Sequence, residues 1–502
     1  MVLLDGSSLS LDALERIAFD REAVGIAPDA AARVRASRDV IVRHLERGTP
    51  VYGVNTGFGA LADVAIPPDQ LAALQLNLLR SHAAGVGQPL PVPAVRALMA
   101  LRANVLAKGF SGIRLETLEA LIALLNAGVH PRVPARGSVG ASGDLAPLAH
   151  LALVLVGEGQ VLGEARDTTQ ALRTAGLTPL ALEPKEGIAL INGTQASAAV
   201  LALACTAAGR LARAADIAAA MSIDALRGSI HPFEARLHAV RPVPGQQASA
   251  ANLWALVEGS GLNRSHEHCG KIQDAYALRC APQVHGAARE AIDFARRLVE
   301  IEANSATDNP MVFADTGEIV SGGNFHGAPV AVAADTLALG VAQLATISER
   351  RTDRLMTAGE SGLPPFLVRD SGLHSGLMMA HVTAAALTAE IKTLAHPASV
   401  DTIPTSAGRE DHVSMSMGAA LKTAEIVDRA RAVLAIELLA GCQALDLLAP
   451  LATSAALDRV RAAIRKIVPT ISMDRPPAPD IEKVSEMIAS GEINRACGID
   501  LR

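Results

Sequence analysis

Apolar residues recur three or four positions apart along most of this chain, which places them on one face of an α-helix. The alternation of apolar and polar residues that would predict a strand does not extend over any length. In the first part of the chain the pattern predicts helices over residues 8–19, 29–47, 69–81, 94–107 and 115–127.

Longer helical patterns follow. An Ala-rich helix runs to about Met221, and Ala288, Ile292, Ala295 and Val299 form a seam at the spacing of bundle helices. Residues 328–351 and 375–394 are similar, and no proline interrupts residues 405–449, which are long enough for a bundle helix even if the first turns are irregular. We predict a mainly α fold with a central bundle of long helices and with turns collected at its ends.

The sequence contains no internal repeat and no low-complexity linker that would mark a domain boundary. We assign residues 1–110 to a loop-rich N-terminal part and residues 111–502 to a helical core. The alternative is that the two form one continuous unit.

Three glycine-punctuated segments break the helical pattern: residues 51–59, 137–148 and 187–194. In the second, the small residues Ala141, Ser142 and Gly143 permit a sharp bend. Asp144 is placed to cap the helix that follows, so the bend would lie at the positive end of that helix and could stabilise negative charge. The alternative is a structural turn that enters a core helix.

Composition narrows the class of protein. Half of the residues are hydrophobic but only 2% are aromatic, so the core must consist of Ala, Leu, Val and Ile, which suits closely packed helices. The net charge of −6, without a basic cluster, gives no indication of nucleic-acid binding. Five scattered cysteines, no signal peptide and no long uncharged span predict a cytoplasmic protein that is not in a membrane.

Polar side chains in the loops are candidates for chemistry. The two tyrosines of the chain, Tyr52 and Tyr276, both fall in polar or Gly-rich segments, where a hydroxyl can act as an acid or a base. Gln273 and Arg279 flank Tyr276, and the planar guanidinium of Arg279 suits a carboxylate. A half-buried tyrosine spacer and an inter-helix ion pair are the structural alternatives.

Two further polar clusters precede long helices. One combines residues 305–310 with residues 322–327, which include Phe325, and the other is residues 410–412, which begin with Glu410. Plain turn chemistry and helix-start charge are the alternatives. The spacing of His266, His268 and Cys269 is not that of a zinc site, so we expect no metal. We find no phosphate loop, dinucleotide fingerprint or serine-hydrolase elbow, so no external cofactor is expected.

Taken together, these motifs resemble those of the aromatic amino acid ammonia-lyases, most closely their histidine-specific branch. The resemblance runs from residues 52–59 to residues 475–481, and residues 141–143 match the Ala-Ser-Gly triplet from which this family builds its electrophile. It implies that Ala141, Ser142 and Gly143 cyclise, with loss of two waters, to 4-methylideneimidazol-5-one (MIO). It also implies an ammonia-lyase fold like that of fumarase and a homotetramer whose active sites are shared between subunits.

The resemblance also implies roles for individual residues. Tyr52 would remove the β-proton of the amino acid substrate, and Arg279 would hold its carboxylate. The residues expected to line the electrophile and the substrate backbone are Asn192, Gln273 and Tyr276, and Phe325 would pack against the ring. In the histidine-specific branch Ser81, His82 and Glu410 would read the imidazole.

One departure concerns the substrate. The histidine-specific branch usually has Asn-Gln before the glutamate, whereas this chain has Gly408 and Arg409. An arginine there could pair with Glu410 and alter imidazole recognition, or could point elsewhere. The expected reaction is elimination of ammonia from L-histidine to give trans-urocanate. The alternatives are another aromatic amino acid, a 2,3-aminomutase, or a catalytically inactive helical scaffold.

Overall fold

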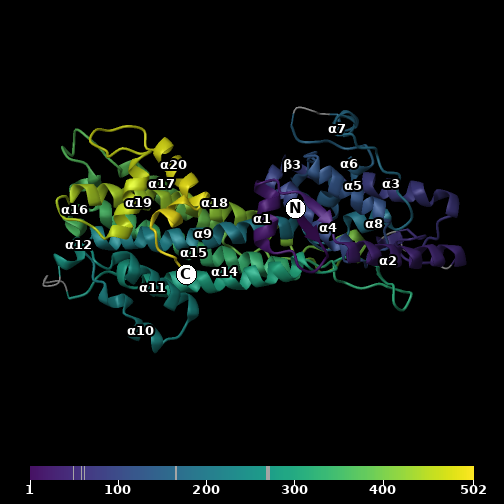
Figure 1. Cartoon of the computed structure of the whole chain (residues 1–502), viewed down its shortest axis with the longest axis horizontal. Helices are drawn as coiled ribbons and strands as arrows, with labels where there is room; N and C mark the ends of the chain where they lie inside the picture. The colour runs from purple at the N-terminus through teal and green to yellow at the C-terminus, as the bar shows by residue number, and fades with distance from the viewer. Residues whose placement is uncertain (49, 58, 62, 164–166, 267–271) are drawn as a thin grey trace. The chain divides into compact units, whose positions relative to one another are not determined.

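The computed structural model describes residues 1–502 except 49, 58, 62, 164–166 and 267–271, and it divides into two compact units. Unit 1 comprises Met1–Thr206, Arg296–Asp335 and Pro397–Leu421, and unit 2 comprises Ala207–Ala295, Thr336–His396 and Lys422–Arg502. Four long helices have residues in both units: α9 (Gln195–Ala225), α14 (Ala281–Ala303), α15 (Ala328–Met356) and α18 (Ser416–Leu447) (Figure 1). The prediction of a mainly α fold with long helices is confirmed.

Unit 1 holds the shorter helices of the N-terminal part of the chain. They are α1 (Leu11–Phe19), α2 (Pro28–Arg47), α3 (Leu71–His82), α4 (Val92–Ala107), α5 (Leu115–Asn126), α6 (Leu145–Leu155), α7 (Thr168–Thr174) and α8 (Glu186–Ile191), with the 3₁₀ turns η1 (Gly59–Leu61), η2 (Pro68–Gln70) and η5 (Ser406–Gly408). Local signals set several of the ends. Ser10 accepts a hydrogen bond from the Ala13 amide at the start of α1, and Gly48 ends α2 in the left-handed conformation.

The strands of unit 1 form three two-stranded sheets. β1 (Val2–Leu4) pairs in parallel with β2 (Val24–Ile26), in the register Val2 to Val24. The antiparallel pairs are β3 (Val86–Pro89) with β4 (Pro134–Arg136), and β5 (Met311–Phe313) with β6 (Glu318–Val320).

Helix α4 is the centre of unit 1, because all of its residues from Ala94 to Ala107 are buried. Helices α1, α2 and α5 pack against it. Helices α3, α6 and α8 pack on one another, and each has a predicted site residue at or beside one end: His82, Ser142 and Asn192 respectively. This packing fixes the relative positions of three segments that are far apart in the sequence.

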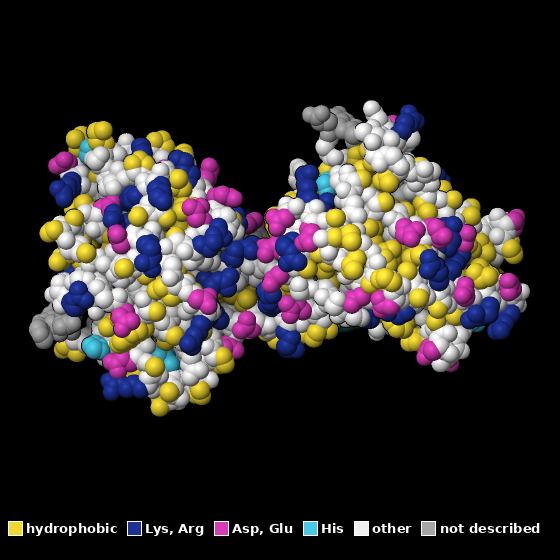
Figure 2. All heavy atoms as spheres, in the orientation of Figure 1, with side chains coloured by type: hydrophobic (Ala, Val, Ile, Leu, Met, Phe, Trp, Pro, Cys, Tyr) yellow, Lys and Arg dark blue, Asp and Glu magenta, His cyan; other side chains and the backbone are white. Residues whose placement is uncertain are grey.

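All the secondary-structure elements named in the described part of unit 2 are helices. Apart from its parts of the four long helices, it contains α10 (Ala235–Ala239), α11 (Pro244–Val257), α12 (Gly261–Arg264), α13 (Tyr276–Arg279), α16 (Ala358–Ser361), α17 (Met378–Leu394), α19 (Ala455–Arg465), α20 (Ala478–Ala489) and α21 (Glu492–Ala496), with the 3₁₀ turns η3 (His231–Phe233) and η4 (Pro365–Leu367). On the faces that Figure 2 shows, acidic and basic side chains are interspersed over both units.

Small residues let the long helices of unit 2 approach closely. A Cβ added to Gly340 of α15 would lie 2.7 Å from the Cβ of Ala291 in α14, and one added to Gly286 of α14 would lie 2.5 Å from the Cα of Gln246 in α11. Contacts this short exclude a larger residue at either position. At these positions the core that the composition predicts, poor in aromatic residues, packs through close approach of the helix backbones.

Two of the long helices, α9 and α15, are long and apolar enough to cross a membrane by length and composition. In each, however, 72% of the apolar window is buried inside the protein. Core helices of soluble proteins pass the same test, and the burial explains the apolar composition here.

Two helix starts differ from prediction. Helix α17 begins at Met378 rather than at residue 375, and α18 begins at Ser416, eleven residues after the start of the proline-free run. The chain cannot be helical before α18 because Ser406, Ala407, Gly408 and Met415 all have positive φ angles. The irregular first turns that the prediction includes therefore form a separate loop, which ends where α18 begins at Ser416.

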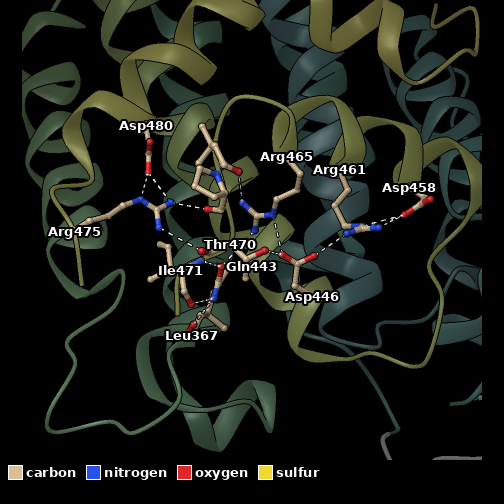
Figure 3. Close-up of polar contacts among 12 residues, drawn as sticks. Leu367, Gln443, Asp446, Asp458, Arg461, Arg465, Thr470, Ile471, Arg475 and Asp480 are labelled. Carbon is tan, nitrogen blue, oxygen red and sulfur yellow. Dashed lines mark hydrogen bonds and ion pairs between the residues drawn. The ribbon is translucent and has the colours of Figure 1, made fainter. Parts of the chain in front are cut away.

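The C-terminal part of unit 2 is held by a network of polar side chains (Figure 3). Asp446 of α18 accepts hydrogen bonds from Arg461 and Arg465 of α19, at 2.9 and 2.8 Å. Arg475 pairs with Asp480 at the start of α20, at 2.9 Å. Residues 475–481, where the resemblance in sequence ends, therefore include an ion pair that fixes the start of α20.

Buried charges link the long helices of unit 2. Arg351 of α15 donates from Nε and Nη2 to Glu437 of α18, at 2.5 and 2.9 Å, and both side chains are fully buried. Asp216 of α9 accepts from His285 and Arg289 of α14. Burial would raise the pKa of Asp216, but the charge of Arg289 and the hydrogen bond from His285 hold it well below its usual range.

We predict that Arg351→Met lowers the free energy of unfolding by about 3–5 kcal/mol, because it leaves the buried Glu437 carboxylate without its guanidinium partner. Chemical denaturation would measure the change. Arg431→Met is the matched control on α18: its ion pair with Asp428 is exposed, so the cost should stay below about 1 kcal/mol. Equal unfolding midpoints for the two variants would contradict the prediction.

Candidate active site

The segment of residues 137–148 folds as a sharp turn that enters α6. Gly140 and Gly143 have φ angles of +69° and +74°, which are open to glycine but strained for other residues. Gly143 also lies against Gly193, where an added Cβ would be 2.3 Å from the Gly193 carbonyl oxygen. The bend predicted from the small residues is present, and the close approach to a second glycine accounts for Gly143.

Asp144 stands at the N-cap position of α6 but does not cap the helix with its side chain. Its carboxylate instead accepts hydrogen bonds from Ser138, at 2.7 Å, and from the amide and hydroxyl of Ser197 in α9, at 2.7 and 2.8 Å. Burial raises the pKa of Asp144 above its usual value. The predicted cap is therefore wrong, because tertiary partners claim the carboxylate and thereby tie the turn to α9.

Ser142, at the tip of the turn, contacts two other predicted site residues. Its hydroxyl donates to Oε1 of Glu410 at 2.5 Å, and its carbonyl oxygen accepts from Nδ2 of Asn192 at 2.8 Å. Asn192 follows α8 directly and is buried. A hydrogen-bond donor on this carbonyl withdraws electron density from the Ser142 residue.

Glu410 is held by hydroxyl groups. Its Oε2 atom accepts from Thr405 at 2.5 Å and from Ser406 at 2.9 Å. Burial would raise the pKa of Glu410, but the hydrogen bonds from Ser142, Thr405 and Ser406 together lower it below its usual value. The carboxylate is therefore ionised at neutral pH and lies beside the turn.

His82 ends α3 and faces the charge of Glu410. Its Nδ1 atom lies 2.9 Å from the Leu78 carbonyl oxygen and 3.0 Å from the Ser81 hydroxyl. A carbonyl oxygen requires a donor, so Nδ1 carries the proton and Nε2 is the acceptor nitrogen. Burial lowers the pKa of His82 although Glu410 opposes this shift, so the ring is neutral at neutral pH.

Tyr52 lies in the loop of residues 51–59 and is half-buried. Its hydroxyl oxygen accepts a hydrogen bond from the Gly59 amide at 3.3 Å. The turn η1 that follows packs against η5, the turn that begins with Ser406. The structure thus brings the tyrosine loop beside the loop that carries Glu410; Phe58 of this motif lies outside the described residues.

The segment around Phe325 borders the same turn. The Gly327 amide donates to the Gly140 carbonyl at 3.1 Å, and Nε2 of His326 lies 3.1 Å from the His412 carbonyl oxygen. Phe325 itself is half-buried. Unit 1 therefore contains most of the predicted site residues, and of these Asn192 and Glu410 contact Ser142 directly. The others in unit 1 are Tyr52, Ser81, His82 and Phe325.

The remaining predicted residues, Gln273, Tyr276 and Arg279, belong to unit 2. Tyr276 and Arg279 begin and end the single turn of α13, and the Arg279 guanidinium stacks over the Tyr276 ring, 4.7 Å from its centroid. Tyr276 is 71% exposed and Gln273 is exposed. The side chains of Tyr276 and Gln273 are thus accessible in the single chain, whereas Arg279 is half-buried.

Arg102 is a site-supporting residue that the sequence reasoning missed. It is fully buried on α4 and donates to the carbonyl oxygens of Ala189 and Asn192, the latter at 2.8 Å, and to Gln195. Burial lowers its pKa to about 10. An arginine within the apolar run of residues 94–107 was the signal available, because a buried charge requires partners.

The hydroxyls of Thr405 and Ser406 were also missed, since their value depends on a loop conformation that local sequence does not specify. Among the described residues no cluster of three or more His, Cys, Asp or Glu side chains could hold a metal. Of the three residues considered for a metal site, His268 and Cys269 lie outside the described residues.

Comparison with known proteins identifies relatives over the whole chain. The family model described as aromatic amino acid lyase matches residues 9–466. A histidine ammonia-lyase of Anaeromyxobacter sp. (strain K) is 56% identical, over 98% of this chain and 99% of that protein. The crystal structure of histidine ammonia-lyase from Trypanosoma cruzi is similar with a TM-score of 0.92 and 46% identity, covering 99% of this chain and 95% of that one. The structure of tyrosine aminomutase from Streptomyces globisporus has a TM-score of 0.95 and 40% identity, covering 100% of both chains.

We predict that Gly143→Ala lowers the free energy of unfolding by about 2–5 kcal/mol, the sum of the left-handed strain and the overlap with Gly193. Gly128→Ala is the matched control: its φ is +71°, but nothing lies within 4 Å of the added Cβ, so only about 1–2 kcal/mol is expected. Chemical denaturation of both variants gives the difference. If Gly143→Ala cost no more than the control, the close approach would not constrain the turn.

Proposed function

The chain belongs to the aromatic amino acid lyase family, and we propose that it eliminates ammonia from L-histidine to give trans-urocanate. The observation that carries this proposal is the hydrogen bond from Ser142 to Glu410, a carboxylate that also feels the charge of His82. Relatives more than 50% identical over nearly the full length are histidine ammonia-lyases, which supports the assignment to the carbon–nitrogen lyases and to this substrate. We propose a cytoplasmic location, as for a soluble metabolic enzyme.

The residues present fit the self-made group that the family uses, MIO. The turn at Ala141, Ser142 and Gly143 is bent by the positive φ of Gly143, and no side chain on Gly143 hinders its nitrogen. Asn192 donates to the Ser142 carbonyl, which would become the ring carbonyl, so it would withdraw electrons from the ring. Once formed, the group would supply an electrophilic methylene that takes up the substrate amine and makes it a better leaving group.

Tyr52 is the proposed base for the β-proton. Its hydroxyl oxygen accepts a hydrogen bond from the Gly59 amide at 3.3 Å, which fixes the position of the ring within its loop. The loop that carries Tyr52 packs beside the Glu410 loop, so the base and the imidazole-binding carboxylate would flank one substrate. The proton passes from the β-carbon to the tyrosine oxygen, and its electron pair forms the new carbon–carbon double bond as the C–N bond breaks.

His82 and Glu410 are proposed to read the imidazole. Glu410 is an ionised acceptor and His82 offers the acceptor nitrogen Nε2, so either suits a ring N–H group of the substrate. Arg409 is exposed, and among the described residues no ion pair joins it to Glu410. The alternative in which this arginine neutralises Glu410 therefore loses its support.

Arg279, Gln273 and Tyr276 are proposed to bind the substrate carboxylate and the amino acid backbone, and Phe325 to pack against the ring. As in the family, we propose a homotetramer in which segments from several subunits complete each active site. The 71% exposure of Tyr276 in the single chain agrees with a role that needs other subunits. Light scattering of the purified protein would test the tetramer.

A 2,3-aminomutase is the second candidate, favoured by the close structural similarity to the tyrosine aminomutase. Such an enzyme would return ammonia to the β-carbon, so its product would be a β-amino acid. Chromatographic analysis of the products separates the two outcomes.

We predict that the purified protein produces urocanate absorbance with L-histidine, but no cinnamate with L-phenylalanine and no coumarate with L-tyrosine. Ser142→Ala should abolish both the turnover and the near-ultraviolet absorbance of the MIO group, because it removes the oxygen whose loss creates the methylene. A fully active Ser142→Ala variant would refute the mechanism. Cinnamate or coumarate without urocanate would refute the substrate alone.

We predict that Tyr52→Phe lowers kcat by about 10²–10⁴-fold, the usual contribution of a positioned general base. Its near-ultraviolet absorbance should equal that of the wild type, because the tyrosine hydroxyl acts on substrate rather than on residues 141–143. Steady-state assays with L-histidine measure the loss. Turnover near the wild-type value would show that Tyr52 is not the base.

A further inference from the structure

The loop that presents Glu410 is a strained clip. Residues 405 and 410 pair as an isolated antiparallel bridge, in which the Thr405 amide donates to the Glu410 carbonyl at 2.9 Å. Between them Ser406, Ala407 and Gly408 have φ angles of +50°, +53° and +80°. Positive φ is strained in Ser406 and Ala407, and strain of this kind persists only where surrounding contacts impose it.

The two oxygens of the Glu410 carboxylate have different partners. Oε2 accepts from the hydroxyls of Thr405 and Ser406, both within the clip. Oε1 accepts from Ser142, which lies across the site on another segment. One oxygen is thus held by its own loop and the other faces the turn at residues 141–143.

Processing of Ser142 would change only one side of this arrangement. On the proposed function, the Ser142 side chain loses its oxygen as water, so Oε1 loses the hydroxyl donor that it has here. The donors to Oε2 are unaffected. The carboxylate would then remain fixed by one oxygen and offer the other to an N–H group of the substrate.

We propose that Thr405 and Ser406 are positioning residues for substrate selection, which hold Glu410 by Oε2 so that Oε1 receives an imidazole N–H. They touch neither the substrate nor the reacting atoms, and act through the carboxylate. This inference rests on the proposed function for the identity of the substrate, but the geometry of the clip does not depend on it.

Among the residues that the structure describes, the other titratable groups beside Glu410 come from three segments. His82 faces it from α3, and Arg409, Asp411 and His412 flank it on its own segment. The turn η1, which packs against η5, consists of Gly59, Ala60 and Leu61, and the titratable side chain that reaches it is Tyr52, whose oxygen accepts the Gly59 amide. Removing a hydroxyl donor from Oε2 therefore acts mainly on the ionised form of Glu410 itself.

Thr405→Val tests the proposal, because it removes the hydroxyl and keeps the shape. We expect KM for L-histidine to rise about tenfold, as for a hydrogen bond to a charged group, with a smaller change in kcat. The acid limb of the pH profile of kcat/KM should move to higher pH, because the carboxylate loses a donor that lowers its pKa. Thr405→Ser should restore both values, and Ser406→Ala should act in the same direction.

Thr402→Val is the matched control in the same loop. The Thr402 hydroxyl accepts the Val413 amide at 2.9 Å and serves the backbone rather than Glu410. This variant should leave KM and the acid limb of the profile unchanged. If Thr402→Val and Thr405→Val moved both by equal amounts, the effect would be general loosening of the loop and the proposal would be overturned.

A binding measurement separates this inference from the proposed function. In the Ser142→Ala background, where no MIO group can form and Oε1 has no hydroxyl donor, we expect calorimetry to detect imidazole binding that Thr405→Val weakens about tenfold. Unchanged binding would overturn the positioning role even if the wild type makes urocanate. If Thr405→Val weakens imidazole binding and the wild type does not turn over histidine, the positioning role is supported and the proposed reaction is refuted.

Discussion

The contact between the backbones of Gly143 and Gly193 is the constraint on which the rest of the site depends. The Asp144 amide donates to the Gly193 carbonyl at 2.7 Å, and neither glycine has room for a side chain. Through this contact the turn before α6 meets the turn between α8 and α9. Because Asn192 immediately precedes Gly193, the same contact places its amide on the Ser142 carbonyl.

Buried charges support this contact from behind. Arg102 binds the carbonyls at the end of α8, and Lys185, at its start, pairs with Asp308 at 3.1 Å with both side chains buried. Desolvation makes such groups costly unless they are paired and hydrogen-bonded. Here they fix short helices and turns that have little apolar surface of their own, so polar contacts supply the rigidity that the site needs.

The spacing of apolar residues predicted the long helices well, because each helix buries residues three or four positions apart along its whole length. Ala288, Ile292, Ala295 and Val299 are all buried in α14, as their spacing indicates. The end of α2 at Gly48 was also readable from local chemistry. The start of α18 was not, because the left-handed Ser406 and Ala407 lie in a loop that hydrogen bonds from Thr405 and Ser406 to Glu410 hold together, and not in a conformation that they prefer by themselves.

The candidate site was identified through its resemblance to a family rather than through physical pattern. Tyr52, Ser142 and Glu410 are separated by 90 and 268 positions, and no local rule brings them together. Asp144 illustrates the limit: its position predicts a helix cap, but the partners that claim it lie elsewhere in the chain. Arg102 was detectable as an anomaly on an apolar helix, although its role required the fold.

The hydrogen bond between Ser142 and Glu410 has a consequence for the order of events in the life of the chain. In the unprocessed chain the serine hydroxyl occupies the same carboxylate oxygen that the substrate is proposed to use, so it acts as an internal competitor. On the proposed function, the dehydration that creates the reactive group also removes this competitor. A newly made chain would therefore become reactive and receptive in a single event, without a separate step that opens the site.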